Sequence, residues 1–414
     1  MSSSGYQRRN YRAFLWHAVF LSITVTFTEV NTVIPAMILQ IGGGEFHVGI
    51  VTAIMIGVPL AAQLNFAGFL HGRRRKKPFL LLGINLRVAS LAAIGLTVVA
   101  VGALSVTQAL LIVYAELLLF TLSGAFAGIA YVDLVGKSFD RPLRARFFTR
   151  KQMISSVGIL VSALIARQVL SMTDYPRNYF ILFLAAAAVL LVATGGFWMI
   201  REQEGQRQER SSYLRTLKSL PKVIKADPNL RSYLVFVNSI GFHVALTPFY
   251  VVLAKERYYL DPALAGNLLF IQIVGMVGAS LLWPALVKTR GFKGVLRLWS
   301  YLSFALPLLA LLVSRVLPLG FYLGLFVFTG AGISARKVSQ DAVVVELSTE
   351  ENRVLYTGII GTLNLSIAVF PIVIGGLIAT LGYVPVFVGV SALALLARLS
   401  LRRLVCPVDR SNRA

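Results

Sequence analysis

The sequence predicts an all-α membrane protein with twelve transmembrane helices in two six-helix, pseudo-symmetric halves. Of the 414 residues, 57% are hydrophobic and only 14% are charged, a composition that does not suit a water-exposed surface. The apolar residues occur in long runs, and a run of about 20 residues is enough to span a bilayer. One long polar segment, 201–231, divides these runs into two sets of six.

Twelve apolar runs follow one another along the chain, separated by polar or charged loops. In the first half they cover 13–40, 46–70, 78–103, 107–135, 153–172 and 178–200. In the second half they cover 232–254, 264–287, 294–314, 318–345, 354–379 and 383–405. The first run is too long for the core of a signal peptide, so we interpret it as the first span. The predicted domains are therefore 1–200, a cytoplasmic linker over 201–231, and 232–414.

The distribution of charge predicts the orientation in the membrane. The chain has 40 Lys and Arg against 17 Asp and Glu, a net charge of +23. An even number of spans places both termini on one side, and the loops of that side hold 34 basic residues against five on the other. The positive-inside rule makes that side cytoplasmic. We expect a multi-pass protein of the bacterial inner membrane or an equivalent plasma membrane. Basic clusters confined to short loops argue against a nucleic-acid partner.

Three pairs of landmarks indicate an internal repeat. They are Pro35 with Pro248, Asp133 with Asp341, and Leu70 with Leu286, separated by 213, 208 and 216 residues. These offsets agree within eight residues. A duplicated six-helix unit is a common construction among transporters, and we expect one here.

The loop after the second run reads Gly68-Phe69-Leu70-His71-Gly72-Arg73-Arg74-Arg75-Lys76-Lys77. Together with twelve spans in two halves and a long central loop, this segment resembles the major facilitator superfamily, and the resemblance covers essentially the whole chain. The chain departs from the family pattern at Gly72, where the family has an acidic residue, and at Arg75, where it has a glycine. The resemblance implies a secondary transporter that works by alternating access, with Arg73 among its gating residues.

Glu29 is the first candidate for a solute or ion site, because an ionisable side chain at membrane depth is costly unless it is paired or faces water. Helical spacing places Glu29 and Asn31 on a broad polar side of the first span. This side predicts a cavity-lining face with Glu29 as a proton or cation site. The alternative is a carboxyl group satisfied by a neighbouring helix.

Four further candidates lie inside other spans. Arg87 and Glu116 lie near the middle of the third and fourth spans, where they either form a buried ion pair or contact the solute directly. His243 has nearly the depth of Glu29 in the other half, and its imidazole could titrate near neutral pH. Tyr250 follows His243 by seven residues on the same helix. A purely structural histidine is the alternative.

Charged residues at the cytoplasmic ends of equivalent helices predict a repeated inner-gate latch. In the first half Asp133 would pair with Arg144 or Arg146, and in the second half Asp341 would pair with Arg353. The spacing of 11 to 13 residues allows each loop to fold back and bring the charges together.

Motifs for other chemistry are missing from the sequence. The single cysteine, Cys406, excludes an internal disulfide and a cysteine metal site. There is no phosphate-binding loop, dinucleotide fingerprint or nucleophile elbow, so we expect neither an enzyme nor a cofactor. The predicted function is secondary active transport of a small solute or ion by a monomer in the lipid bilayer, driven by protons, another ion or the solute gradient. The alternatives are an uncoupled facilitator, a lipid-handling carrier, and a non-transporting sensor or scaffold.

Overall fold

The computed structural model of the chain describes residues 3–71, 73–203, 221, 223–259, 262–347, 356, 359–361 and 363–404. Within these ranges the regular secondary structure is entirely helical. Ten segments are long and apolar enough to cross a membrane. The chain is therefore a multi-pass helical membrane protein, while the number of twelve spans stays a prediction.

The chain divides into two compact units. Unit 1 comprises Met1–Gly43 and Ile54–Ser211, and unit 2 comprises Gly44–Ala53 and Ser212–Ala414. The ten residues Gly44–Ala53 therefore belong to unit 2, although the segments before and after them belong to unit 1. A π-helix over Ala53–Gly57 lies where the chain passes back into unit 1. The predicted linker over 201–231 stays a prediction, because most of it lies outside the described residues.

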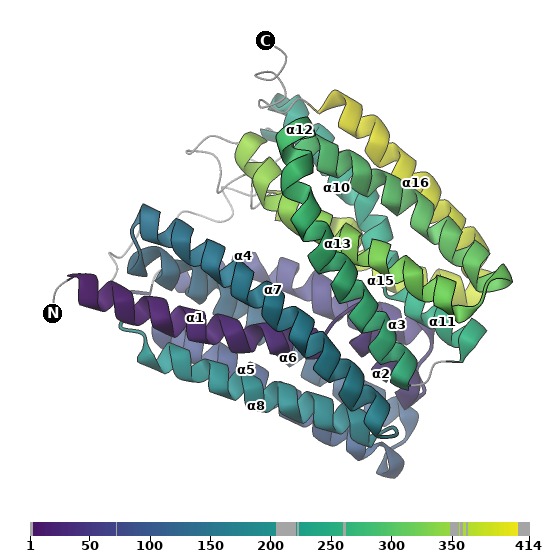
Figure 1. The fold of residues 1–414 in the computed structure, drawn as a ribbon, viewed down its shortest axis with the longest axis horizontal. Helices are drawn as coiled ribbons and strands as arrows, with labels where there is room; N and C mark the ends of the chain where they lie inside the picture. The colour runs from purple at the N-terminus through teal and green to yellow at the C-terminus, as the bar shows by residue number, and fades with distance from the viewer. Residues whose placement is uncertain are drawn as a thin grey trace. The chain divides into compact units, whose positions relative to one another are not determined.

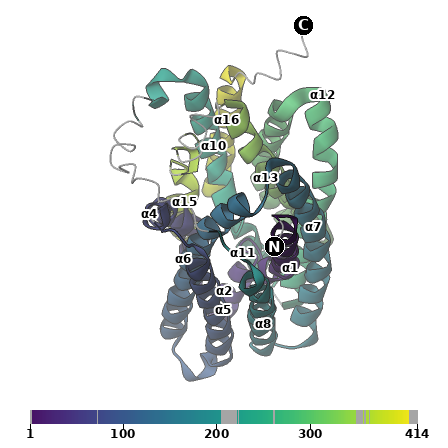
Figure 2. The ribbon, with the colours of Figure 1, turned by 90° about the vertical axis from the view of Figure 1, so that its left-hand side faces the viewer.

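Unit 1 is a helical bundle. Its helices are α1 (Ser3–Phe27), α2 (Val33–Ile41), α4 (Val58–His71), α5 (Lys77–Val99), α6 (Val106–Ser138), α7 (Arg141–Met172) and α8 (Arg177–Met199). Helix α5 packs on α6 and α8, and α1 packs on α7 and α8 (Figure 2). A side chain at Gly83 would place its Cβ only 2.8 Å from the Ser123 carbonyl oxygen. Glycine at this position therefore allows α5 and α6 to approach closely.

Unit 2 contains α3 (Glu45–Thr52), α10 (Pro228–Leu246), α11 (Phe249–Tyr258), α12 (Pro262–Val316), α13 (Leu319–Leu347), α15 (Leu365–Leu381) and α16 (Tyr383–Arg403) (Figure 1). The 55 residues of α12 would measure about 80 Å in one straight helix, against a hydrocarbon core of about 30 Å. Gly291 interrupts the helical backbone with φ 63° and ψ −179°. The predicted runs 264–287 and 294–314 lie on either side of this break.

The first long helix of each unit is interrupted. Residues 28–32 separate α1 from α2, and Thr247 and Pro248 separate α10 from α11. A third interruption, at Leu363 and Asn364, precedes α15. Non-helical backbone at membrane depth is tolerated where protein or a water-filled cavity surrounds it, and transporters use such breaks to hold solutes and ions. These breaks are therefore the places where functional side chains are expected.

Candidate functional site

Glu29 lies in the break between α1 and α2, and its carboxylate accepts hydrogen bonds from the residues of the break itself. Its Oε2 accepts hydrogen bonds from the Asn31 backbone N–H at 2.6 Å and from Thr32 Oγ1 at 3.0 Å, and its Oε1 accepts one from Asn31 Nδ2 at 2.7 Å. The carboxylate thus satisfies the Asn31 N–H, a backbone group in the break between the two helices. Glu29 and Asn31, which were expected on one polar side of the first span, contact each other directly, and the cavity-lining role of this side stays a prediction.

His243 and Tyr250 lie on either side of the break in unit 2. The Tyr250 hydroxyl is 3.5 Å from His243 Nδ1, and both side chains are buried. The Tyr322 hydroxyl donates a 2.7 Å hydrogen bond to the Tyr250 carbonyl oxygen. A buried, hydrogen-bonded pair of this kind suits the structural alternative for His243 as well as the functional one.

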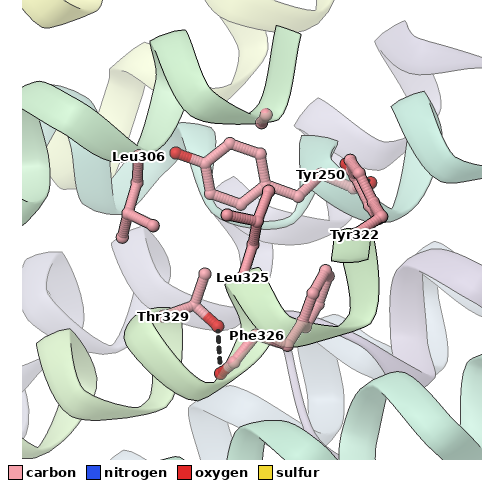
Figure 3. Close-up of a pocket in the computed structure, with 7 residues that line it drawn as sticks. Tyr250, Leu306, Tyr322, Leu325, Phe326 and Thr329 are labelled. Carbon is pink, nitrogen blue, oxygen red and sulfur yellow. Dashed lines mark hydrogen bonds between the residues drawn. The ribbon is translucent and has the colours of Figure 1, made fainter. Parts of the chain in front are cut away.

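A narrow apolar pocket lies beside Tyr250, but it is not a solute site. Leu306, Tyr322, Leu325, Phe326 and Thr329 line it with Tyr250, and the Thr329 hydroxyl is turned to the Phe326 carbonyl oxygen (Figure 3). The space is too narrow for a water molecule. A larger cleft of about 230 Å³ in unit 2 is lined partly by Glu256, Arg257, Arg315 and Tyr383.

The Asn238 side chain forms hydrogen bonds to both sides of the third break, which precedes α15. This role was not predicted from the sequence. Asn238 Nδ2 donates to the Leu363 carbonyl oxygen at 2.8 Å, and Asn238 Oδ1 accepts from the Ser366 backbone N–H at 3.3 Å. One amide side chain on α10 therefore satisfies both ends of the interruption before α15. An asparagine inside an apolar helical run was the available signal, because a polar side chain at that depth needs a partner.

The predicted ion pair between Arg87 and Glu116 is not formed. Thr97 Oγ1 donates to Glu116 Oε1 at 2.8 Å, and Glu116 Oε2 has no hydrogen-bond partner. The Arg87 guanidinium lies over the Phe120 ring, 4.3 Å from its centroid. Helices α5 and α6 are antiparallel neighbours, and their register places Thr97, rather than Arg87, opposite Glu116.

Glycine makes the space that Arg87 occupies. A Cβ at Gly124 would lie 3.0 Å from Arg87 Nε and 3.1 Å from its Cζ. The Nε atom itself is buried and has no hydrogen-bond partner. The contact with the Phe120 ring returns roughly 0.5–2 kcal/mol, whereas an unpaired buried cation costs several kcal/mol. Arg87 is therefore held at an energetic cost.

More polar groups gather around His17, beyond those predicted from the sequence. The His17 ring stacks on Phe197 with centroids 3.8 Å apart, and its centroid is 6.2 Å from that of Tyr131. Lys151 Nζ lies 4.9 Å from the Tyr131 centroid. Arg87 and Lys151 both interact electrostatically with the His17 imidazole. Four helices, α1, α5, α6 and α7, thus contribute to one polar cluster in unit 1.

Asp133 binds two lysines and not Arg146, one of its two predicted latch partners. Its carboxylate binds Lys76 Nζ and Lys137 Nζ, each at 2.7 Å, and Arg146 is exposed. The i,i+4 lysine on the same helix and the lysine that precedes α5 take the place of Arg146. The side chains of Arg144, Asp341 and Arg353 lie outside the described residues, so the pairing of Asp133 with Arg144 and the latch in the second half stay predictions.

The basic loop before α5 is held by other contacts. The Arg73 guanidinium lies 4.9 Å from the Phe69 ring centroid and 5.6 Å from that of Phe79. The Glu202 carboxylate accepts the backbone N–H groups of Lys76 and Lys77 at 2.6 and 2.8 Å. This carboxylate caps the first turn of α5, where an anion is favoured. Arg73 therefore rests on aromatic rings and has no carboxylate partner within 4 Å among the described residues.

Nearly full-length similarity to solved structures identifies the fold. The nucleoside transporter NupG matches with a TM-score of 0.71 and 12% identity over 95% of this chain and 100% of its own. A bacterial homologue of the iron transporter ferroportin matches with 0.70 and 13% over 98% and 99%. A D-xylose–proton symporter matches with 0.68 and 12% over 97% and 98%.

The chain has the fold of the major facilitator transporters. This agrees with the resemblance stated from the loop after the second span, and the matched structures are transporters rather than enzymes. No protein-family model matches the chain. No curated protein sequence matches it either. Among the described residues no group of three His, Cys, Asp or Glu side chains could hold a metal ion.

Proposed function

We propose that this chain moves a small solute across the membrane by alternating access, as a secondary transporter. The observation that carries the proposal is the similarity in fold, over nearly the whole chain, to a nucleoside transporter, a bacterial homologue of the iron transporter ferroportin and a D-xylose–proton symporter. The interrupted first helices of both units support it, because such breaks provide polar groups at membrane depth. Neither feature is needed by a sensor or scaffold.

Glu29 is our candidate for proton coupling. Oε2 accepts two hydrogen bonds in the α1–α2 break, so a proton placed on that atom would displace at least one donor and loosen the backbone of the break. Proton binding would thereby change the conformation of the first helix as the site alternates between the two sides. Glu116 is the second candidate, because its Oε2 is buried without a partner.

The uncoupled facilitator is favoured by the same hydrogen bonds. Three of them already satisfy the Glu29 carboxylate, and a carboxylate that only stabilises the break needs no proton. Transport in liposomes separates the two. With coupling at Glu29, a Glu29→Gln variant loses uptake driven by a pH gradient but keeps exchange of solute present on both sides.

Comparison of Glu29→Gln with Glu116→Gln shows which of the two carboxyl groups is the coupling site. Gradient-driven uptake that survives in Glu29→Gln and is lost in Glu116→Gln would move the coupling site to Glu116. Gradient-driven uptake that survives in both variants would place the coupling at neither carboxyl group. A wild-type chain that exchanges solute but shows no uptake driven by a pH gradient would support the facilitator. If the purified chain exchanges no solute of a broad panel above protein-free liposomes, transport itself is contradicted.

We further propose that both termini and the 201–231 segment are cytoplasmic, in the inner membrane of a bacterium or an equivalent membrane. The support is the ratio of 34 to five basic residues between the two sets of loops. In a Cys406→Ser background, Ser211→Cys should not react with an impermeant maleimide in intact cells. Gly102→Cys, exposed at the predicted outer end of the third span, is the positive control. Labelling of Ser211→Cys in intact cells would overturn this orientation.

A further inference from the structure

Two cations on the helices of unit 1, Arg87 and Lys151, face aromatic rings and have no acidic partner among the described residues. Arg87 and Lys151 each lie ten residues after the first residue of α5 and α7, about 15 Å along the helix axis. No carboxylate of the described residues lies within 4 Å of either side chain, since the ion pairs there involve Lys76 and Lys137. Both cations instead face aromatic rings, Arg87 over Phe120 and Lys151 over Tyr131.

The acidic residues of this unit are engaged elsewhere. Helices α1, α2 and α4 to α8 contain only two acidic residues, Glu116 and Asp133. Glu116 accepts from Thr97, and Asp133 binds two lysines. Glu29, in the first break, accepts its hydrogen bonds from the break itself. The positive charge of the polar cluster is therefore uncompensated within the helices of unit 1.

Two hydrogen-bond donors of the cluster have no acceptor. Arg87 Nε and the Tyr131 hydroxyl are both buried without a hydrogen-bond partner. A buried donor without an acceptor is destabilising, and a buried cation without an anion is more so. Gly124 leaves room for the guanidinium. Side chains that fold at such a cost, on different helices and around one place, fit a ligand that supplies the missing acceptors.

We propose that Arg87 and Lys151 bind the anionic group of the transported solute, a carboxylate or a phosphate, with the Tyr131 hydroxyl as an additional donor. Charge-assisted hydrogen bonds from arginine suit either oxyanion. The rings of Phe120 and Phe197, near the same cluster, favour an organic anion with an apolar body. This inference rests on the proposed transport function and adds the class of solute.

Ligand-induced thermal stabilisation of the purified full-length chain tests the site, because a ligand that binds only the native state raises the unfolding temperature. The probes are the sodium salts of succinate and phenyl phosphate, compared with glucose and choline chloride at equal ionic strength. Succinate or phenyl phosphate should stabilise the wild-type chain, whereas glucose and choline should not. Arg87→Gln and Lys151→Gln should each weaken binding at least tenfold.

Two controls separate a binding role from a structural one. Arg150→Gln removes the exposed neighbour of Lys151 and should keep wild-type affinity. Without ligand, Arg87→Gln should unfold at the wild-type temperature or above it, because it removes an unpaired buried charge. A lower unfolding temperature with unchanged anion affinity would make Arg87 structural and overturn the proposal, as would stabilisation by neither anion. An equal loss of anion affinity in Arg150→Gln would show that the effect comes from general surface charge, and this result would also overturn the proposal.

Counterflow into liposomes distinguishes failure of the site from failure of the transport proposal. Anion binding that depends on Arg87, without exchange of labelled succinate or phenyl phosphate, would support the anion site and contradict the transport proposal. Exchange of glucose or choline that neither anion inhibits would support the transport proposal and contradict the anion site.

Discussion

Replacing Gly375 with alanine should force α15 away from α3, while the same change at the next residue should be harmless. A Cβ at Gly375 would lie 2.6 Å from the Glu45 carbonyl oxygen and 3.0 Å from Phe46 Cα, whereas a Cβ at Gly376 meets nothing within 4 Å. Ordinary contact begins at 3.4 Å, so the gap to Glu45 must open by 0.8 Å. Both contacting atoms belong to the backbone, which cannot move aside as a flexible side chain would.

The energetic difference between the two variants isolates this clash. Overpacking of a close contact typically costs about 1–3 kcal/mol. Each alanine also gains up to about 1 kcal/mol of helix propensity over glycine, and that gain cancels when the two variants are compared. Gly375→Ala should therefore be less stable than Gly376→Ala by about 1–3 kcal/mol, and Gly376→Ala should equal or exceed the wild type.

Thermal unfolding of the purified chain in one detergent, at one scan rate, measures this order. The fixed scan rate matters because membrane proteins often unfold irreversibly, which makes the midpoint depend on rate. The expected order of unfolding temperatures is Gly376→Ala at or above wild type, and Gly375→Ala below both. A Gly375→Ala variant as stable as Gly376→Ala would refute the close packing of α3 on α15.

Other positions give further expectations. Asn238→Leu should destabilise unit 2 by about 2 kcal/mol, because it removes one hydrogen bond at each end of the break before α15. Asp133→Asn should cost only about 1 kcal/mol, because its ion pairs with two lysines are partly exposed, but it should slow solute exchange if these contacts close an inner gate. Burial and the Asp227 carboxylate raise the pKa of Tyr356 to about 12, above its ordinary value near 10. The stabilisation from the neutral hydroxyl, which donates to Asp227 at 2.7 Å, should therefore be complete below pH 10 and lost between pH 10 and 12, and Tyr356→Phe should remove this loss.

The same measurements can contradict these expectations. Asn85, an exposed asparagine on α5 whose amide bonds only within its own helix, provides the control for Asn238; equal losses in the two leucine variants would remove any special role for the break. Unchanged exchange rates and unchanged cysteine accessibility in Asp133→Asn would exclude a gating role. A pH profile of unfolding that is identical in the wild type and Tyr356→Phe above pH 10 would contradict the hydrogen bond to Asp227.

The sequence predicted the fold because its strongest signals are local. Apolar runs and basic loops indicate directly which segments lie in the membrane and which lie in water. The loop from Gly68 to Lys77 carried the family resemblance. The interruption at Gly291 matches the polar gap between the runs 264–287 and 294–314. The polar side chains around Glu29 were also found, since a carboxyl group at membrane depth needs partners wherever they come from.

The partners of the candidate residues could not be predicted, because they depend on the register of neighbouring helices. Arg87 and Glu116 were expected to pair from their depths alone, yet a shift along α5 places Thr97 at Glu116. Asp133 was expected to bind Arg144 or Arg146, and two lysines bind it in place of Arg146. Loop conformation and side-chain reach decide such contacts, and neither has a periodic signature in the sequence.

The cluster around Lys151 was missed for a different reason. Lys151 belongs to a basic loop in the charge count, so its position on α7 beside Tyr131 was hidden by the topology argument. Inside the first six predicted spans the only Lys or Arg residues are Arg87 and Arg167, fewer than the three acidic residues Glu29, Glu116 and Asp133. A count of charges inside the spans therefore gave no sign of excess cations, because Lys151 lies just before the predicted run 153–172.

Counterflow of labelled succinate and phenyl phosphate into liposomes containing the purified chain tests most directly whether the protein carries an anionic solute through the Arg87 and Lys151 site. The expected result is saturable accumulation with at least one of the two anions in the wild type and in Arg150→Gln, and at least a tenfold loss in Arg87→Gln and Lys151→Gln. Accumulation that matches protein-free liposomes, or that persists unchanged in both Arg87→Gln and Lys151→Gln, would contradict it.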